Sequence, residues 1–244
     1  MTQLSGDERK GYVRGMFGQI AGRYDLMNRL MALGQDVGWR KEAIRKLEIS
    51  PGSPDASGMV APLVLDAGAG TGDLALQLRK EHPHARVVAS DLTPEMMRVG
   101  MQRPGAEAVL WVAADAENLP FAPGAFDAAV SGYLLRNVPD LDRTLAEQRR
   151  ILKPGGRMAA LDTTPPQRNL LRPFLHFYLQ VIIPFLGRLI TGEAEAYRYL
   201  PDSTEGFVEA GRLAERIRAA GFAGVGFVRR MFGTMAIHWG KKEE

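Results

Sequence analysis

The chain contains no cysteine, and only four of its 244 residues are histidines. Without cysteine there can be no disulfide, no thiolate metal site and no cysteine nucleophile. The histidines show no spacing typical of a zinc site, and the His82-Pro83-His84 segment is interpreted as a loop. We therefore expect no metal centre.

Long hydrophobic runs are missing as well. The first ten residues are polar and lack the apolar centre of a secretory signal. The most apolar stretch, residues 173–187, is shorter than the ~20 apolar residues that a membrane span needs, and His176 and Pro184 interrupt it. These features predict a cytoplasmic protein that does not cross a membrane.

Charge is mildly basic, with a formal net charge of +3 and a pI of about 9.3. The basic residues are spread along the chain, which permits attraction to anionic lipid or nucleic acid without implying either. No Lys/Arg stripe with interleaved aromatic residues is present, so we expect no nucleic acid partner.

The order of elements predicts a single α/β domain. Residues 12–47 have helical periodicity and are expected to form a lid within residues 1–50, and residues 50–61 are rich in Pro, Gly and Ser, as in a linker. Strands and helices then alternate through a core at 62–164, which is typical of a doubly wound parallel sheet. A helical insertion is expected at 165–205, and residues 206–244 should add a helix and an antiparallel pair of strands. The expected strands are 63–65, 86–90, 108–112, 126–131, 157–161, 223–229 and 232–239, and the expected helices after the lid are 73–80, 94–101, 141–152 and 207–220.

A glycine-rich turn directly follows the first strand. Asp66 ends this strand, and Gly68, Gly70 and Gly72 let the backbone turn sharply and approach a ligand, with Thr71 between them. The G-x-G-x-G spacing differs from the G-x-G-x-x-G of nicotinamide sites. An acid at this strand end suits a ligand with a cationic amino group, although a plain strand-to-helix turn remains the alternative.

The next two strands end in further acidic loops. Asp91, followed by Leu92, is placed to accept hydrogen bonds from a ribose diol, unless it caps the helix that begins near Pro94. The carboxylate of Asp115 can accept from an adenine amine, and the Ala116 amide can donate to the ring. Together the three loops predict one crevice at the carboxyl ends of the strands.

These loops resemble those of the Rossmann-like class I methyltransferases that use S-adenosylmethionine. Parts outside them resemble the ubiquinone/menaquinone biosynthesis C-methyltransferase family more narrowly, from about residue 12 to 240. The matching segments are residues 24–28 with Trp39-Arg40, 135–138, 150–156, 195–200 with Ser203, and 233–240. The resemblance implies a mostly parallel seven-stranded sheet with a helical lid and a helical insertion.

The chain departs from the family pattern at several positions. Asp36 replaces a histidine, Ala32 a serine and Asp162 a glutamate, and Gly132 stands where some members place a serine against the cofactor. The cofactor assignment survives these changes, and we keep Gly132 as a cofactor contact. Asp36 is either a substitute base or a structural residue, and we favour the structural interpretation.

The resemblance implies methyl transfer from S-adenosylmethionine to a ring carbon of demethylmenaquinol, in menaquinone synthesis. A benzoquinol precursor of ubiquinone and a different small-molecule acceptor are the alternatives. The candidate catalytic residues are Arg136 and Asn137, facing the crevice, with Tyr24 and Asp25 from the lid. Arg136 would hold the ring oxygen by a charge-assisted hydrogen bond. Its alternative role is an ion pair with Asp140 or Asp142, and that of Tyr24 is core packing.

The apolar stretch at 170–190 is flanked by Arg172 and Arg188. With a prenylated quinol as substrate, this stretch has two possible roles. It can line an entry for the tail or contact the inner face of the membrane peripherally. Equally, it can be a buried helix or a contact between the subunits of a homodimer.

Overall fold

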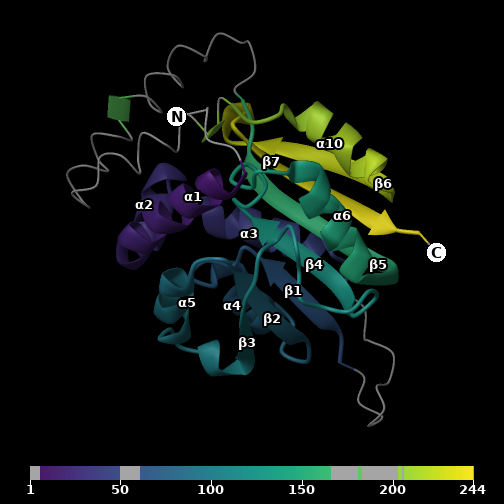
Figure 1. The fold of residues 1–244 in the computed structure, drawn as a ribbon, viewed down its shortest axis with the longest axis horizontal. Helices are drawn as coiled ribbons and strands as arrows, with labels where there is room; N and C mark the ends of the chain where they lie inside the picture. Colours follow the sequence, from purple (N-terminus) through teal and green to yellow (C-terminus); the bar gives the residue numbers. More distant parts are fainter. Residues whose placement is uncertain (1–5, 50–60, 166–180, 183–202, 205, 244) are drawn as a thin grey trace.

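The computed structural model describes residues 6–49, 61–165, 181–182, 203–204 and 206–243. At its centre is a seven-stranded sheet in the order β3-β2-β1-β4-β5-β7-β6 (Figure 1). β1 to β5 are parallel, and β7 runs antiparallel to both β5 and β6. The predicted mostly parallel sheet with an antiparallel edge is thus confirmed. Its strands are β1 Leu63–Ala67, β2 Arg86–Asp91, β3 Val109–Ala113, β4 Phe126–Gly132, β5 Leu152–Thr163, β6 Phe222–Arg230 and β7 Met235–Lys242.

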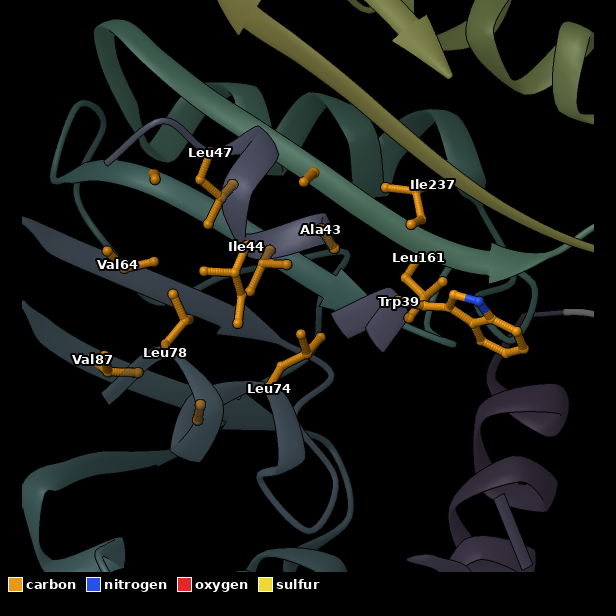
Figure 2. Packing of buried hydrophobic residues seen from close by; sticks show 14 of the residues in the cluster. Trp39, Ala43, Ile44, Leu47, Val64, Leu74, Leu78, Val87, Leu161 and Ile237 are labelled. Atoms are coloured by element: carbon orange, nitrogen blue, oxygen red, sulfur yellow. The ribbon is translucent and has the colours of Figure 1, made fainter. Parts of the chain in front are cut away.

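Helices cover both faces of the sheet because consecutive residues of the central strands are apolar and their side chains point to opposite faces. Val64 and Val87 belong to the cluster that includes α3 and α4, whereas Leu65 and Val88 belong to the cluster that includes α6 and α10. Figure 2 shows the first cluster, in which Ile44 of α3 points toward the strands. These helices are α3 Asp36–Lys46, α4 Asp73–Glu81, α6 Leu141–Ile151 and α10 Ala210–Ala219.

The N-terminal helical region is broken twice. α1 Gly6–Ile20 passes through a 3₁₀ turn at Ala21–Arg23 into α2 Tyr24–Met31, and a turn with Leu33 and Gly34 at positive φ precedes α3. α1 and α2 pack with Met96 of α5 (Pro94–Met101) and lie together outside the sheet (Figure 1). Within the expected lid, α3 instead packs against the sheet.

Three predicted boundaries need correction. β5 begins at Leu152, directly after α6, so residues 153–156 form its irregular start, with a register shift against β4. α10 begins at Ala210, three residues later than expected. The last strand begins at Met235 because residues 231–233 form a 3₁₀ turn with Phe232 at positive φ.

Most of the predicted insertion, including the apolar stretch at 170–190 and the segment 195–200, lies outside the described residues. Its interpretations as a tail entry, membrane contact or dimer contact are therefore not addressed by the structure. None of the helices in the described ranges is long and apolar enough to span a bilayer.

Candidate functional site

A pocket opens where the parallel strands end, beneath α1 and the start of α2. It has about 730 Å³ of free space, the open mouth included. Most of the residues predicted to bind the cofactor line it: Gly68, Gly70, Asp91, Leu92, Asp115, Ala116 and Gly132. Asp66, Thr71 and Gly72 do not. The crevice predicted from three successive loops is therefore present.

Two glycines of the first loop line this pocket. Gly68 and Gly70 both have positive φ, and a Cβ at Gly68 would lie 2.7 Å from Cδ1 of Leu134. Gly72 has a different role, since a Cβ there would lie 2.5 Å from the Trp111 ring. Thus the first two glycines keep the pocket open, while the third permits close packing behind it.

Asp66 lies behind the glycine loop and is completely buried. Its Oδ2 accepts a hydrogen bond from the Ala75 amide at 2.9 Å, and its Oδ1 has no partner within the described ranges. Burial raises the pKa of Asp66 to about 8. A buried carboxyl with one unsatisfied oxygen suits a site that receives a cation.

Asp91 joins the first and second loops. Its Oδ2 accepts from the Gly70 amide and its Oδ1 from the Thr93 amide, each at 2.7 Å. The Thr93 side chain does not cap α5, so Asp91 orders the start of that helix while also lining the pocket. Burial raises the pKa of the Asp91 carboxyl. The ribose-binding and structural interpretations are thus compatible in one residue, because a carboxylate oxygen can accept more than one hydrogen bond.

Asp115, in the third loop, is already engaged by α1. Lys10 Nζ lies 2.6 Å from Asp115 Oδ2 and 2.7 Å from Glu117 Oε2. Arg9 also donates to the backbone oxygen of Arg136 at 2.9 Å. These contacts hold α1 over the pocket. They were missed at the sequence level because nothing in the local pattern of α1 indicates which loop it meets.

Asp25 and Thr71 contact each other outside the pocket. Thr71 Oγ1 donates to Asp25 Oδ1 at 2.5 Å, and Arg103 lies 3.2 Å from Asp25 and 2.7 Å from Asp73. Burial, together with Asp73, raises the pKa of Asp25. The structure therefore places Asp25 in an ion-pair network that joins α2 to α4, although its predicted role was catalytic.

The same network contains Asp36. Its Oδ2 accepts from Arg40, which also lies 2.9 Å from Asp73, and both Asp36 and Arg40 are buried. This geometry supports the structural interpretation of Asp36, since one oxygen of its buried carboxylate is engaged by a buried guanidinium.

Arg136 forms an ion pair, but not with either expected partner. Its Nη1 lies 2.6 Å from Asp162 Oδ1, whereas Asp140 caps α6 and Asp142 pairs with Arg216. The alternative role, an ion pair with Asp140 or Asp142, is wrong in its partner, because β5, adjacent in the sheet, brings Asp162 closer. Arg136 is buried and does not line the pocket.

Tyr24 and Asn137 do line the pocket, beside Tyr133. Asn137 donates from Nδ2 to the backbone oxygen of Tyr133 at 2.7 Å. Burial raises the pKa of the Tyr24 phenol despite the opposing field of Arg136. Tyr24 also packs edge-on to Phe17, so it packs in the N-terminal apolar cluster and lines the pocket at the same time.

Tyr133 was missed by sequence reasoning. It has φ +59, follows β4 directly, and its ring lies 5.1 Å from the Arg136 guanidinium. Burial raises the pKa of its phenol. A non-glycine residue with positive φ in a pocket marks backbone strain of the kind found at functional sites.

The model of the ubiE/COQ5 methyltransferase family matches residues 2–242. A ubiquinone/menaquinone biosynthesis C-methyltransferase of Desulfotalea psychrophila is 45% identical, over 94% of this chain and 90% of that protein. A demethylmenaquinone methyltransferase of Thermus thermophilus is 40% identical, over 93% of this chain and all of that protein. Among solved structures, an S-adenosylmethionine-dependent methyltransferase of Thermotoga maritima shares the fold with a TM-score of 0.63 at 19% identity, covering 94% and 99% of the two chains.

Proposed function

The chain belongs to the ubiE/COQ5 methyltransferase family, and from this membership we propose that it methylates a ring carbon of demethylmenaquinol, giving menaquinol, with S-adenosylmethionine as donor. The observation that carries the proposal is the pocket in which the predicted loops meet Tyr24 and Asn137. A benzoquinol precursor of ubiquinone is the second candidate acceptor, because the 45% identical relative is named for both quinones.

The residues of the pocket fit the proposed cofactor. Asp91 would hold the ribose, and Asp115 with the Ala116 amide would hold the adenine. Gly68 and Gly70 leave room for close approach of the amino acid portion, and the unsatisfied Oδ1 of Asp66 lies behind the glycine loop, where a bound cation would favour the charged form of this carboxyl. The side chains that would contact the ligand are mostly carboxylates, and this favours a cationic nucleoside over a phosphorylated one.

S-adenosylmethionine supplies a methyl group made electrophilic by its sulfonium centre. The chain must therefore orient the acceptor ring, favour its phenolate and exclude water. α1 covers the pocket through its contacts with the loops after β3 and β4, which limits the access of water.

Two groups would act on the acceptor: Tyr24 of α2, which lines the pocket, and Arg136, which lies beside the Tyr133 ring without lining the pocket. Because burial raises its pKa, Tyr24 stays protonated at neutral pH and can donate a hydrogen bond to a ring oxygen. Arg136 stays charged beside Asp162 and acts through its field, which favours negative charge on the ring. Asn137 positions the strained Tyr133 backbone by its hydrogen bond. We assign Asp25 and Thr71 to holding α2 against the glycine loop.

Titration calorimetry with S-adenosylhomocysteine tests the cofactor site. We expect Asp91→Asn to weaken binding at least about tenfold, because the amide that replaces one acceptor oxygen opposes an N–H donor. Asp127→Asn is the matched control, since Asp127 also accepts from a backbone amide but lies at the opposite end of the sheet, at the start of β4. No heat with the folded wild-type protein would overturn the proposal.

Turnover assays then identify the acceptor. Reduced short-chain demethylmenaquinol should gain one methyl group by mass spectrometry, and a benzoquinol analogue tested in parallel decides between the two candidates. Cofactor binding without turnover of either quinol would exclude both.

The proposed acceptor carries a prenyl tail and is held in a bilayer. We therefore propose that the protein works in the cytoplasm, at the inner face of the membrane. The family membership and the apolar stretch at 170–190 support this location.

A further inference from the structure

The outward side of α2 is apolar and exposed. Leu26 and Leu30, four residues apart, are 53% and 39% exposed, and Leu33 in the following turn is 67% exposed. Residues at this spacing share one face of a helix. In Figure 1, α2 lies at the periphery of the molecule. We call these three leucines the α2 face.

Leu33 has an unfavourable backbone conformation. Its φ is +50, a left-handed conformation that favours glycine or asparagine. The turn is held by hydrogen bonds from the Leu33 amide to the Leu30 oxygen and from the Gly34 amide to the Arg29 oxygen. An exposed leucine adds nothing to the core, so folding alone does not explain a leucine at this position.

A basic groove borders the α2 face. It has about 1320 Å³ of free space, the open mouth included, and lies between α2, α3, α4 and the turn after α5. Arg29, on the helical turn between Leu26 and Leu30, lines it. The other cations of the basic groove are Arg40, Arg79, Lys80 and Arg103.

The acidic groups nearby neutralise only part of this charge. Among the described residues that line the groove, Asp73 is the one carboxylate, and it lies within ion-pair distance of both Arg40 and Arg103. Across the described ranges, no carboxylate lies within 4 Å of a charged nitrogen of Arg29, Arg79 or Lys80. Arg79 donates instead to the backbone oxygens of Pro83 and Ala85. The basic groove therefore has cationic capacity left for an anionic partner.

We propose that the α2 face and the basic groove together dock on an anionic bilayer. The leucines insert at the boundary between headgroups and acyl chains, while Arg29, Arg79 and Lys80 meet lipid phosphates. Charge complementarity selects this partner, because an apolar strip bordered by unneutralised cations matches an anionic lipid interface.

This surface also brings lipid close to the active site, an argument that rests on the proposed function. Tyr24 begins α2 and lines the pocket, whereas the leucines project from the opposite side of the same helix. A helix with its side chains is about 10 Å across. Docking on α2 therefore places the pocket about one helix width from a lipid-held quinol.

Cosedimentation of the full chain with lipid vesicles tests the docking. We expect binding to vesicles of phosphatidylcholine with 30% phosphatidylglycerol, and weak binding to pure phosphatidylcholine. Arg29→Glu/Lys80→Glu should weaken partitioning at least roughly 25-fold, since each basic residue near an anionic surface strengthens binding about fivefold. Leu30→Ser/Leu33→Ser should weaken it about tenfold or more.

Matched control variants are available away from this surface. Arg212→Glu/Arg218→Glu reverses two exposed charges on α10. Leu110→Ser removes a 55% exposed leucine from β3, whose neighbour Val109 faces the α3 and α4 cluster, so Leu110 faces the other side of the sheet. Both controls should bind as the wild type does. Equal loss in controls and test variants, or unchanged binding in the test variants, would overturn the proposal, as would equal binding to neutral vesicles.

Solution turnover separates this proposal from the proposed function. With a short-chain demethylmenaquinol and no vesicles, the α2 and groove variants should retain wild-type turnover. Wild-type vesicle binding without any turnover would reject the function and leave the docking surface standing. Turnover together with vesicle binding that these variants do not change would support the function and reject the docking surface.

Discussion

Asp66, one residue before the end of β1, is a completely buried carboxyl with only one of its oxygens hydrogen-bonded, to the Ala75 amide. Desolvation disfavours its charged form, which raises its pKa to about 8 from an ordinary value of 3.8. A cation bound nearby would reverse this preference. In the free protein the charged form of Asp66 is therefore destabilised by burial, and a cationic ligand would stabilise it.

This pKa predicts a pH-dependent stability. The folded state holds a proton that the unfolded chain releases, so the stabilisation is complete below pH 3.8 and is lost as the pH rises toward 8. Between pH 6.5 and 8, Asp66 lowers the free energy of unfolding by up to about 1.4 kcal/mol per pH unit. Asp66→Asn can still accept from Ala75 and should flatten this dependence.

Urea denaturation at several pH values across this window measures the effect. His238, whose pKa is lowered by burial from 6.5 to about 4, acts mainly below pH 6.5 and contributes equally to the variant and the wild type. Equal slopes in the variant and the wild type would contradict a buried, protonated Asp66.

Tyr24 offers a test of chemistry at one residue. Tyr24→Phe removes the hydroxyl proposed to donate to the acceptor but keeps the ring that packs against Phe17. We expect kcat to fall roughly 10- to 100-fold, while S-adenosylhomocysteine affinity stays nearly unchanged. Steady-state kinetics with parallel calorimetry measures both, and an unaltered kcat would assign Tyr24 to packing alone.

At the scale of elements, ion pairs fix how the N-terminal helices meet the core. Arg40 of α3 contacts Asp36 at the start of the same helix and Asp73 at the start of α4. Arg103, after α5, contacts Asp73 and Asp25 of α2. Three helices and the turn after α5 are therefore joined by alternating charges, beside the glycine loop on which the cofactor site depends.

Removing Arg40 should destabilise the protein strongly. In Arg40→Met, Asp36 and Asp73 lose a buried cation, and we expect a loss of ~3 kcal/mol or more in the free energy of unfolding. Arg157→Met is the control, because its partner Glu48 is largely exposed and the pair should contribute less than ~1 kcal/mol. Chemical denaturation measures both, and similar losses would show that burial does not set the cost.

For the molecule as a whole, the pocket couples loops that are distant in sequence. Asp91 bonds to Gly70, and Lys10 of α1 to Asp115. A ligand that fills the pocket should therefore stabilise the fold as a unit.

Thermal unfolding tests this coupling. S-adenosylhomocysteine at about 100 times its Kd should add ~2.7 kcal/mol and raise Tm by roughly 5–10 °C. At the same ligand concentration, Asp91→Asn should show a much smaller rise. A wild-type Tm that is insensitive to the ligand would argue against the pocket as its binding site.

Local patterns in the sequence were enough to predict the elements and the loops of the cofactor pocket. Strand and helix periodicities are properties of neighbouring residues, and the carboxyl ends of parallel strands necessarily meet at one edge of the sheet. Asp91 and Gly70 could therefore be assigned to one crevice, and a structural role could be favoured for Asp36.

Folding in three dimensions settled which distant residues meet. Lys10 and Asp115 are separated by 105 positions, Thr71 and Asp25 by 46, and Arg136 finds Asp162 across two adjacent strands. No local periodicity encodes such pairs, because they depend on how α1, α2 and β5 pack against the rest of the chain. The exposure of Leu33 and the strain at Tyr133 likewise follow from packing and backbone geometry, which the order of residues does not reveal.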